Sequence, residues 1–213
     1  MRVTGIIDLS HEVKDAMPVH PYDGVVELRR DRELLRDGYT NSRLSTGMHA
    51  GTHIDAPAHF LECAKNISDY ELRHFMGRGC LLDVRGQQLI GYRPEYEDMV
   101  RPRDAVILLT GFGQFYGTAE YYLRFSDHPV VEAGLAEFFV RRGITMLGMD
   151  LPKPDNYPFP VHKLLLGHDI FIIENMTNLE ALLTVPEFEL AAFPLKIAAE
   201  GSPVRALALC YAD

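Results

Sequence analysis

The sequence predicts a mixed α/β fold rather than a regular doubly wound sheet, and three observations support this. Short apolar runs bounded by turn residues recur along the chain, which is typical of buried strands. Helical patterns are few and fall at irregular intervals between these runs. The 213 residues contain no repeat, no low-complexity tract and no Gly/Ser/Pro-rich linker, so we expect one domain over residues 1–213.

The elements can be placed approximately by their apolar patterns. Strands or extended segments are expected over residues 5–9, 25–32, 45–56, 81–84, 105–110, 144–149, 170–173, 190–199 and 206–209. Residues 12–24 contain two prolines and a glycine and are expected to form a loop. Helices are expected over 120–123, 130–142 and 161–166, and Gly143 suits the end of the second.

Composition narrows the class of protein. The net charge of −9 argues against a role in binding nucleic acid or an anionic membrane surface. No window approaches the ~20 apolar residues of a membrane span, and the first residues lack the features of a signal peptide, so a cytoplasmic protein is expected. The three cysteines, Cys63, Cys80 and Cys210, are too widely spaced for a zinc motif, so any metal must be held by His and carboxylate.

Residues 49–59, which read HAGTHIDAPAH, form a candidate metal site. On a strand, alternate side chains point to the same side, so His49, His53 and Asp55 would share a face. Gly51, between the two histidines, would leave room for an ion, and His59 could turn back over the site. Imidazole and carboxylate ligands together match the preference of zinc and related divalent ions.

Further ligands are expected between residues 161 and 174. Glu174 ends an apolar run and shares a face with Ile172, and a carboxylate on a buried strand is costly unless it is paired or bound to a metal. Either His162 or His168 could supply an imidazole, and the residues alone do not decide between them.

The spacing H-x-G-T-H-x-D-x-P-x-H, from His49 to His59, resembles the signature of the metal-dependent cyclase/hydrolase family that includes bacterial kynurenine formamidase and isatin hydrolase. Other segments resemble further landmarks of this family in the same order: Asp8–Ser10, Met17–Pro18, Gly148–Asp150, His162 to Leu166 with Glu174–Asn175, and Ser202–Ala206. The resemblance implies the single-domain β/β/α "swivelling" fold of that family. It also implies a homo-oligomer, dimer or tetramer, in which neighbouring chains contribute near each active site.

The resemblance also implies roles for the candidate residues. His49 and His53 would hold one zinc ion, His162 a second, with Asp55 and Glu174 bridging both, and manganese would accept similar ligands. The implied activity is hydrolysis of an amide or cyclic amide by metal-activated water, as in an arylformamidase. His59 would then give a proton to the leaving nitrogen.

Departures from the family pattern concern the small-molecule substrate. The chain has no Trp, and His20 stands where kynurenine formamidases have an aromatic residue in the first loop. Lys153 adds a cation after Asp150, which favours an anionic substrate. Phe112, in the glycine-containing segment 110–117, could wall the pocket, and the GxGxxxG spacing of that segment does not match a dinucleotide loop.

Two other functions remain open from the sequence. The same centre could serve a metal-dependent cyclase or dehydratase, or a lactone hydrolase. The chain could also be a non-catalytic protein that holds metal, although the retention of His59 argues for catalysis. Cys63 is expected to be an inert buried thiol, and Arg205 is expected either to form a structural ion pair or to close the site.

Overall fold

The computed structural model describes residues 2–62 and 64–211. Its main feature is an eight-stranded sheet in the order β1-β12-β11-β5-β7-β9-β10-β4. The strands are β1 (Val3–Asp8), β4 (His53–Asp55), β5 (Met76–Asp83), β7 (Ala105–Leu109), β9 (Met146–Met149), β10 (Phe171–Glu174), β11 (Glu187–Pro194) and β12 (Gly201–Tyr211). β4 also pairs with β12, so all of these strands except β1 close into a barrel.

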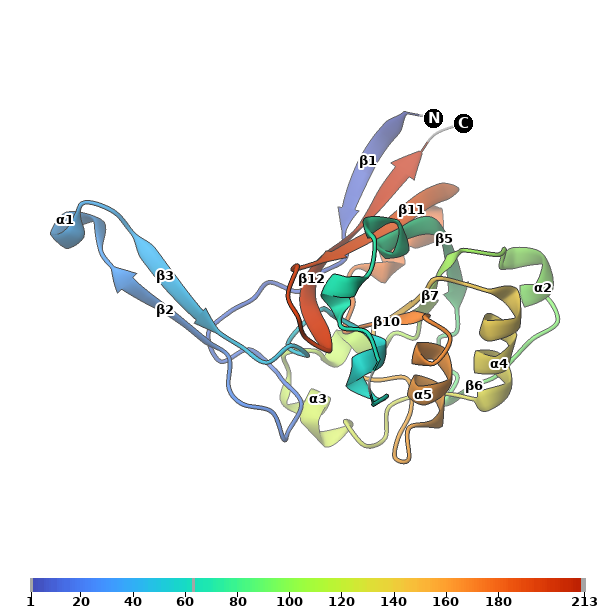
Figure 1. The fold of residues 1–213 in the computed structure, drawn as a ribbon. Helices are drawn as coiled ribbons and strands as arrows, with labels where there is room; N and C mark the ends of the chain where they lie inside the picture. Colours follow the sequence, from blue (N-terminus) through green and yellow to red (C-terminus); the bar gives the residue numbers. More distant parts are fainter. Residues whose placement is uncertain (1, 63, 212–213) are drawn as a thin grey trace.

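The helices lie mainly on one side of the barrel (Figure 1). They are α1 (Leu34–Asp37), α2 (Tyr96–Met99), α3 (Ala119–Leu123), α4 (Ala133–Arg142) and α5 (Pro160–Leu166). α4 and α5 pack against each other beside the parallel strands β5, β7, β9 and β10. The mixed α/β fold expected from the sequence is confirmed.

β7 shows how the core is divided between the barrel interior and the helical layer. Val106 and Leu108 belong to the cluster that α4 and α5 cover, whereas Ile107 and Leu109 belong to the cluster inside the barrel. The strand is therefore buried on both faces, which explains its unbroken apolar sequence. On the neighbouring β9, the absence of a side chain at Gly148 makes room for Met176, whose sulfur lies 2.5 Å from where a Cβ would be.

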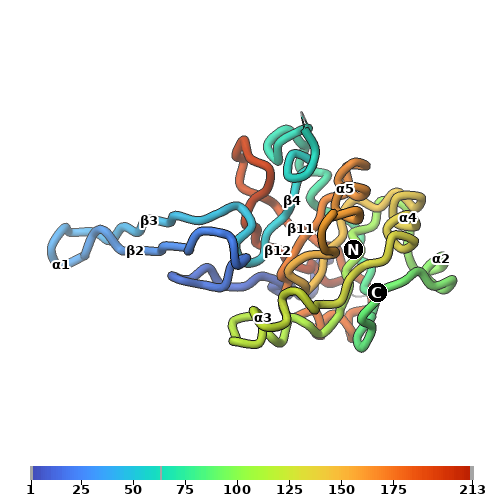
Figure 2. The backbone as a smooth tube through the Cα atoms, turned by 90° about the horizontal axis from the view of Figure 1, so that it is seen from below, coloured from blue at the N-terminus to red at the C-terminus, as the bar shows by residue number. Residues whose placement is uncertain are grey.

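A two-stranded ribbon projects away from the barrel (Figures 1 and 2). It consists of β2 (Glu27–Arg32) and β3 (Asn41–Ser45), which pair with each other antiparallel, and α1 lies at its tip. None of its residues from 27 to 45 is buried. A second short pair, β6 (Leu89–Ile90) with β8 (Val130–Val131), lies beside α4.

Several element boundaries differ from the sequence-based prediction. The extended segment expected over residues 45–56 contains the end of β3 at Ser45 and the short strand His53–Asp55, and it is interrupted between them, where Gly51 adopts a left-handed conformation with φ of 64°. The helix expected from residue 130 starts at Ala133, since the two residues at the start of that range pair with β6. Gly143 ends the helix with a positive φ, as expected. Within the described residues, no helix has the length and apolar character needed to cross a membrane.

Candidate metal centre

The centre of the site is formed where β4 pairs with β10. His53 lies opposite Glu174 in the antiparallel register, and Asp55 lies opposite Ile172, so His53, Asp55 and Glu174 point to the same side. Ligand atoms of these three buried residues all lie within 4.8 Å of one another. His53 Nε2 is 3.3 Å from a Glu174 oxygen and 3.6 Å from Asp55 Oδ1.

The orientation of His53 is set by the turn before β4. Its Nδ1 donates a hydrogen bond to the Gly51 carbonyl oxygen at 2.8 Å, which leaves the Nε2 lone pair directed toward the two carboxylates. Glycine is favoured at position 51, because φ is positive and an added Cβ would come within 2.6 Å of the Met17 methyl group, which would then have to move. Gly51 therefore orients a ligand, in addition to leaving space.

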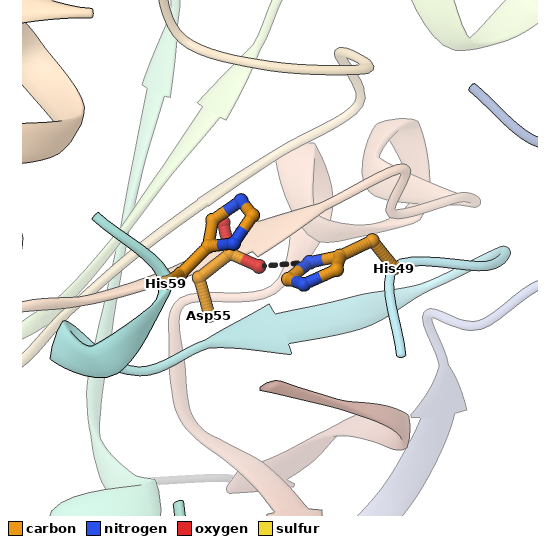
Figure 3. A group of neighbouring side chains, drawn as sticks. All are labelled: His49, Asp55 and His59. Carbon is orange, nitrogen blue, oxygen red and sulfur yellow. Dashed lines mark hydrogen bonds and ion pairs between the residues drawn. The ribbon is translucent and has the colours of Figure 1, made fainter. Parts of the chain in front are cut away.

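His49 and His59 also lie beside Asp55 (Figure 3). His49 Nδ1 lies 2.8 Å from Asp55 Oδ1, and the His49 and His59 rings stack with centroids 4.0 Å apart. Burial disfavours the charged form of His49, but the bond to Asp55 outweighs it and raises its pKa to about 9. Burial lowers the pKa of His59, and the nearby Asp55 charge opposes this effect only in part.

His162 completes the cluster from helix α5. Its Nε2 lies 3.2 Å from a Glu174 oxygen and 4.0 Å from Asp55 Oδ2, while its Nδ1 bonds to the Asp155 carboxylate. His168, the alternative ligand, is exposed and donates to the Leu164 carbonyl oxygen instead. The structure thus brings His162 and not His168 to the site.

Asp155 is a positioning residue that the sequence analysis missed. Besides bonding to His162, its carboxylate accepts a hydrogen bond from the Val161 backbone N–H at 2.6 Å, in the first turn of α5. It thereby fixes the tautomer that presents His162 Nε2 to the other candidate ligands. The sequence did contain a signal for this role, because Asp155 lies seven positions before His162, in a proline-rich turn that leads into a helix.

The donor set fits a divalent cation. Two carboxylates, Asp55 and Glu174, are buried side by side, and Asp55 Oδ2 has no hydrogen-bond partner among the described residues. Burying such charges is costly unless a positive charge compensates them. Imidazole nitrogens surround them, and such mixed nitrogen and oxygen ligands suit zinc.

A cavity of about 240 Å³ opens onto this cluster. It is lined by His20, Asp23, His49, His53, His59, Phe60, Tyr121, Phe125, Pro152, Lys153, Phe159, His162, Glu174 and Asn175. Two of the residues expected to contact substrate, His20 and Lys153, are thus on its wall. Tyr121 and Asn175 are wall residues that the sequence analysis did not single out.

Phe112 lies elsewhere. It is 5% exposed, belongs to the core cluster beneath α4 and α5, and packs near Tyr121 with ring centroids 6.3 Å apart. The sequence-based prediction treated residues 110–117 as a loop near the pocket, but a short 3-10 turn at Phe112–Phe115 turns the Phe112 ring inward. Phe112 therefore supports the Tyr121 wall from behind and does not face the cavity.

Asp150 and Arg205 have roles in structure. Asp150 accepts hydrogen bonds from the backbone N–H groups of Thr110, Gly111 and Gly113 and from the Thr110 hydroxyl, and so holds this turn in place. Arg205 forms an exposed ion pair with Asp8 at 2.6 Å. Cys63 lies outside the described residues.

Comparison with known proteins agrees with this architecture. A profile of the family described as "Putative cyclase" matches residues 7–156, and the chain belongs to this family. Similar curated proteins include kynurenine formamidase of Bacillus cereus, 29% identical over 212 residues that cover 97% of this chain and 98% of the relative. Kynurenine formamidase of Bacillus cytotoxicus is 28% identical over 213 residues, with the same coverage.

Solved structures show the same fold. An isatin hydrolase bound to the product analogue thioisatinate superposes with a TM-score of 0.85 at 22% identity, covering 97% of this chain and 92% of that chain. A potential metal-dependent hydrolase with cyclase activity superposes with a TM-score of 0.78 at 22% identity, covering 98% and 99%. The family membership expected from the His49–His59 spacing is confirmed.

Proposed function

We propose that this protein is a metal-dependent hydrolase that cleaves a non-peptide amide or cyclic amide. The observation that carries the proposal is the buried pair Asp55 and Glu174, which lies among imidazoles at the base of an open cavity. Relatives named kynurenine formamidase and a structural neighbour named isatin hydrolase support the amide class of substrate.

In this proposal His49 and His53 would hold one divalent ion and His162 a second, and both ions would share the carboxylates of Asp55 and Glu174. Zinc, with manganese as an alternative, would supply an activated water and polarise the carbonyl that is attacked. The chain's own contribution is to orient the ligands, since Gly51 and Asp155 fix the tautomers of His53 and His162.

His59 is proposed as the catalytic residue that protonates the leaving nitrogen. It lines the cavity and stacks on His49, and burial lowers its pKa, so it would take up the proton released by the attacking water before it gives one to the leaving nitrogen. A general acid needs a pKa near the working pH, and imidazole is the side chain best suited to this near neutrality. Unlike His53 and His162, it makes no hydrogen bond from its ring to another described residue, so its nitrogens are free to transfer a proton.

The test begins with metal. Removal of metal with a chelator is expected to abolish hydrolysis of formylated aromatic amines and lactams, and zinc or manganese is expected to restore it. Elemental analysis should find up to two ions per chain, and fewer in an Asp55→Ala variant. Full activity in metal-free protein would contradict the proposal.

The same protein preparations distinguish the proposed amide hydrolysis from two alternative functions. Ring closure, dehydration or lactone cleavage on the same centre would appear as turnover of those compounds with no cleavage of amides. A non-catalytic metal-holding role would be excluded by a His59→Ala variant that keeps its metal but loses all hydrolysis.

We also propose that the chain self-associates through the ribbon of residues 27–45. A two-stranded ribbon is marginally stable alone, and this one exposes Leu28, Leu35 and Leu44. It carries five arginines and four carboxylates that pair with one another, a balance of +1 in a chain of −9, so the ribbon can approach a second copy without the repulsion that two strongly acidic surfaces would have. Light scattering should find a dimer or tetramer, and a variant with the ribbon replaced by a short turn should be monomeric.

A further inference from the structure

The wall of the cavity at the metal centre contains a cation that pairs with no carboxylate among the described residues. Lys153 is half-buried, and its ammonium makes no hydrogen bond or ion pair with any residue the structure describes. It lies over the Phe125 ring at 5.1 Å from the centroid and over the Phe159 ring at 6.0 Å. These two aromatic faces hold the charge at the cavity wall and exclude water around it.

The nearby carboxylates are already engaged. Asp155 bonds to His162 and to the α5 backbone, and Glu174 lies against His53 and His162. Asp23, also on the cavity wall, is exposed and forms no ion pair within the described chain. Lys153 is therefore available to an anion that enters the cavity, whereas an uncharged molecule would leave its ammonium partly dehydrated and unpaired.

We propose that Lys153 recognises a carboxylate on the substrate, so that the enzyme's substrates are amides that carry an anionic group away from the bond that is cleaved. This inference rests on the proposed amidase function. His20 lies on the same aromatic residue, with its ring centroid 4.8 Å from that of Phe125, and so borders the same anion position. A charge-assisted bond of this kind favours the charged over the uncharged substrate by about 10- to 100-fold.

The test compares formanilides that bear a ring carboxylate at the ortho, meta or para position with their neutral methyl esters. We expect at least one acid to exceed its ester in kcat/KM by about 10-fold or more, and Lys153→Met to remove most of that ratio through KM. Lys65→Met is the matched control, because Lys65 lies over the Tyr70 ring at 5.1 Å but away from the cavity. Lys153→Glu should shift the preference to ammonium-bearing formanilides.

Equal kcat/KM for acid and ester in the wild type, or an equal change of the ratio in the Lys153 and Lys65 variants, would overturn the inference. If the wild type cleaves neither member of any pair, the proposed function fails instead. In that case calorimetry with the metal-loaded protein still tests Lys153, using ligands in which a sulfonamide replaces the formyl amide of each acid and ester. The acid should bind about 10-fold more tightly than its ester, and Lys153→Met should make the two affinities equal.

A different observation points to Asn175. Its backbone φ is 51°, its N–H donates to the Leu151 carbonyl oxygen, and its own carbonyl accepts from the Thr52 hydroxyl at 2.7 Å. Its side-chain oxygen accepts from the Tyr121 hydroxyl at 2.9 Å. Among the described residues its amide nitrogen makes no hydrogen bond, and the residue lines the cavity.

We infer that the Asn175 amide nitrogen donates a hydrogen bond to the carbonyl oxygen of the bond that is cleaved, and that Tyr121 is the positioning residue that turns this nitrogen toward the cavity. Such a donor stabilises the negative charge that develops on the oxygen, and loss of one typically lowers kcat about 10²- to 10³-fold. The backbone and side-chain contacts of Asn175 fix the donor in place before the substrate binds.

Asn175→Gly keeps the positive φ and removes the donor, so we expect kcat to fall about 100-fold or more with wild-type metal content. Asn178→Gly is the control, because Asn178 also has a positive φ of 57° but donates to the Asp8 carbonyl oxygen away from the cavity. Asn175→Asp also removes the amide donor, but it keeps a side-chain oxygen that can accept the hydrogen bond from the Tyr121 hydroxyl. A kcat within 3-fold of wild type in either Asn175 variant would overturn the inference.

Discussion

The three residues of β4 and the nineteen residues of the ribbon from 27 to 45 differ in how their strands are paired and buried. β4 pairs on one side with β10 and on the other with β12, and all of its side chains are buried. The ribbon strands pair only with each other, and none of their residues is buried. The comparison teaches that the candidate metal ligands lie where segments distant in the sequence meet, whereas the ribbon, which pairs only with itself, contributes none of them.

The largest effect should come from the carboxylates on the buried side of this comparison. Glu174→Gln preserves the shape of the side chain but removes one of the two carboxylate charges at the centre, so we expect hydrolysis to fall more than about 10³-fold and metal content to decrease. Assays with saturating zinc and elemental analysis measure both. Glu189→Gln, on β11 of the same barrel, is the control and should keep its activity; a Glu174 variant with normal turnover would remove this residue from the site.

A large effect on stability should follow from opening a cavity in the barrel wall. Leu108 on β7 is fully buried beneath the helices, so Leu108→Ala should lower the free energy of unfolding by about 2–5 kcal/mol. Urea denaturation with an unchanged m-value is the measurement. A loss below about 1 kcal/mol would show that α4 and α5 collapse into the space.

A smaller effect is expected at the residue that orients His162. Asp155→Asn can no longer accept both bonds as a charged group, and its amide can present a donor to His162 Nδ1, which favours the wrong tautomer. Metal affinity or activity should fall about 10- to 100-fold. Added zinc should recover part of the activity, which distinguishes mis-orientation of the ligand from loss of the fold.

A pH-dependent effect should arise at His11, which stacks on Tyr116 with ring centroids 3.7 Å apart. Burial lowers its pKa from 6.5 to about 4, so between these values the unfolded chain holds more protons than the folded one. The contribution of His11 to stability is therefore complete above pH 6.5 and declines as the pH falls toward 4, by less than about 1 kcal/mol per pH unit because the ring is partly exposed. The pH dependence should be flatter in His11→Phe, as measured by thermal unfolding; an identical profile would exclude this histidine.

The smallest effect is expected on the exposed side of the comparison. Leu35, at the ribbon tip, is fully exposed, so Leu35→Ala should change the free energy of unfolding of the isolated chain by less than about 0.5 kcal/mol. Unfolding measured over a range of protein concentrations tests this. A larger loss that grows with concentration would indicate that Leu35 is buried between copies.

Much of the site could be predicted because its residues lie close together in the sequence. His53 and Asp55 do occupy one face of a strand, and Glu174 ends an apolar strand as expected. His49 reaches the same carboxylate although it precedes the strand, because the Gly51 turn redirects the chain. The spacing was therefore informative even where the strand assignment behind it was wrong.

The supporting residues could not be predicted in the same way. Asp155 acts through a turn into α5, and the Tyr121–Asn175 bond joins segments 54 residues apart. The closing of the barrel depends on pairing between β4 and β12. A three-residue strand is too short for its sequence pattern to predict that it pairs with both β10 and β12. Local periodicity reports burial of a segment but not the identity of the distant segment that buries it.

The pairing of β4 with β12 also has a consequence for biosynthesis. Asp55 lies opposite Gly201, where a side chain would come within 2.9 Å of both the His49 ring and the Ile54 carbonyl oxygen. On a ribosome that adds about 5–20 residues per second, residues 53–55 therefore wait on the order of ten seconds for the strand that closes over them. Through most of that interval the nascent chain has His49, His53 and Asp55 but lacks His162 and Glu174, so the full set of candidate ligands can assemble only late in synthesis or after it.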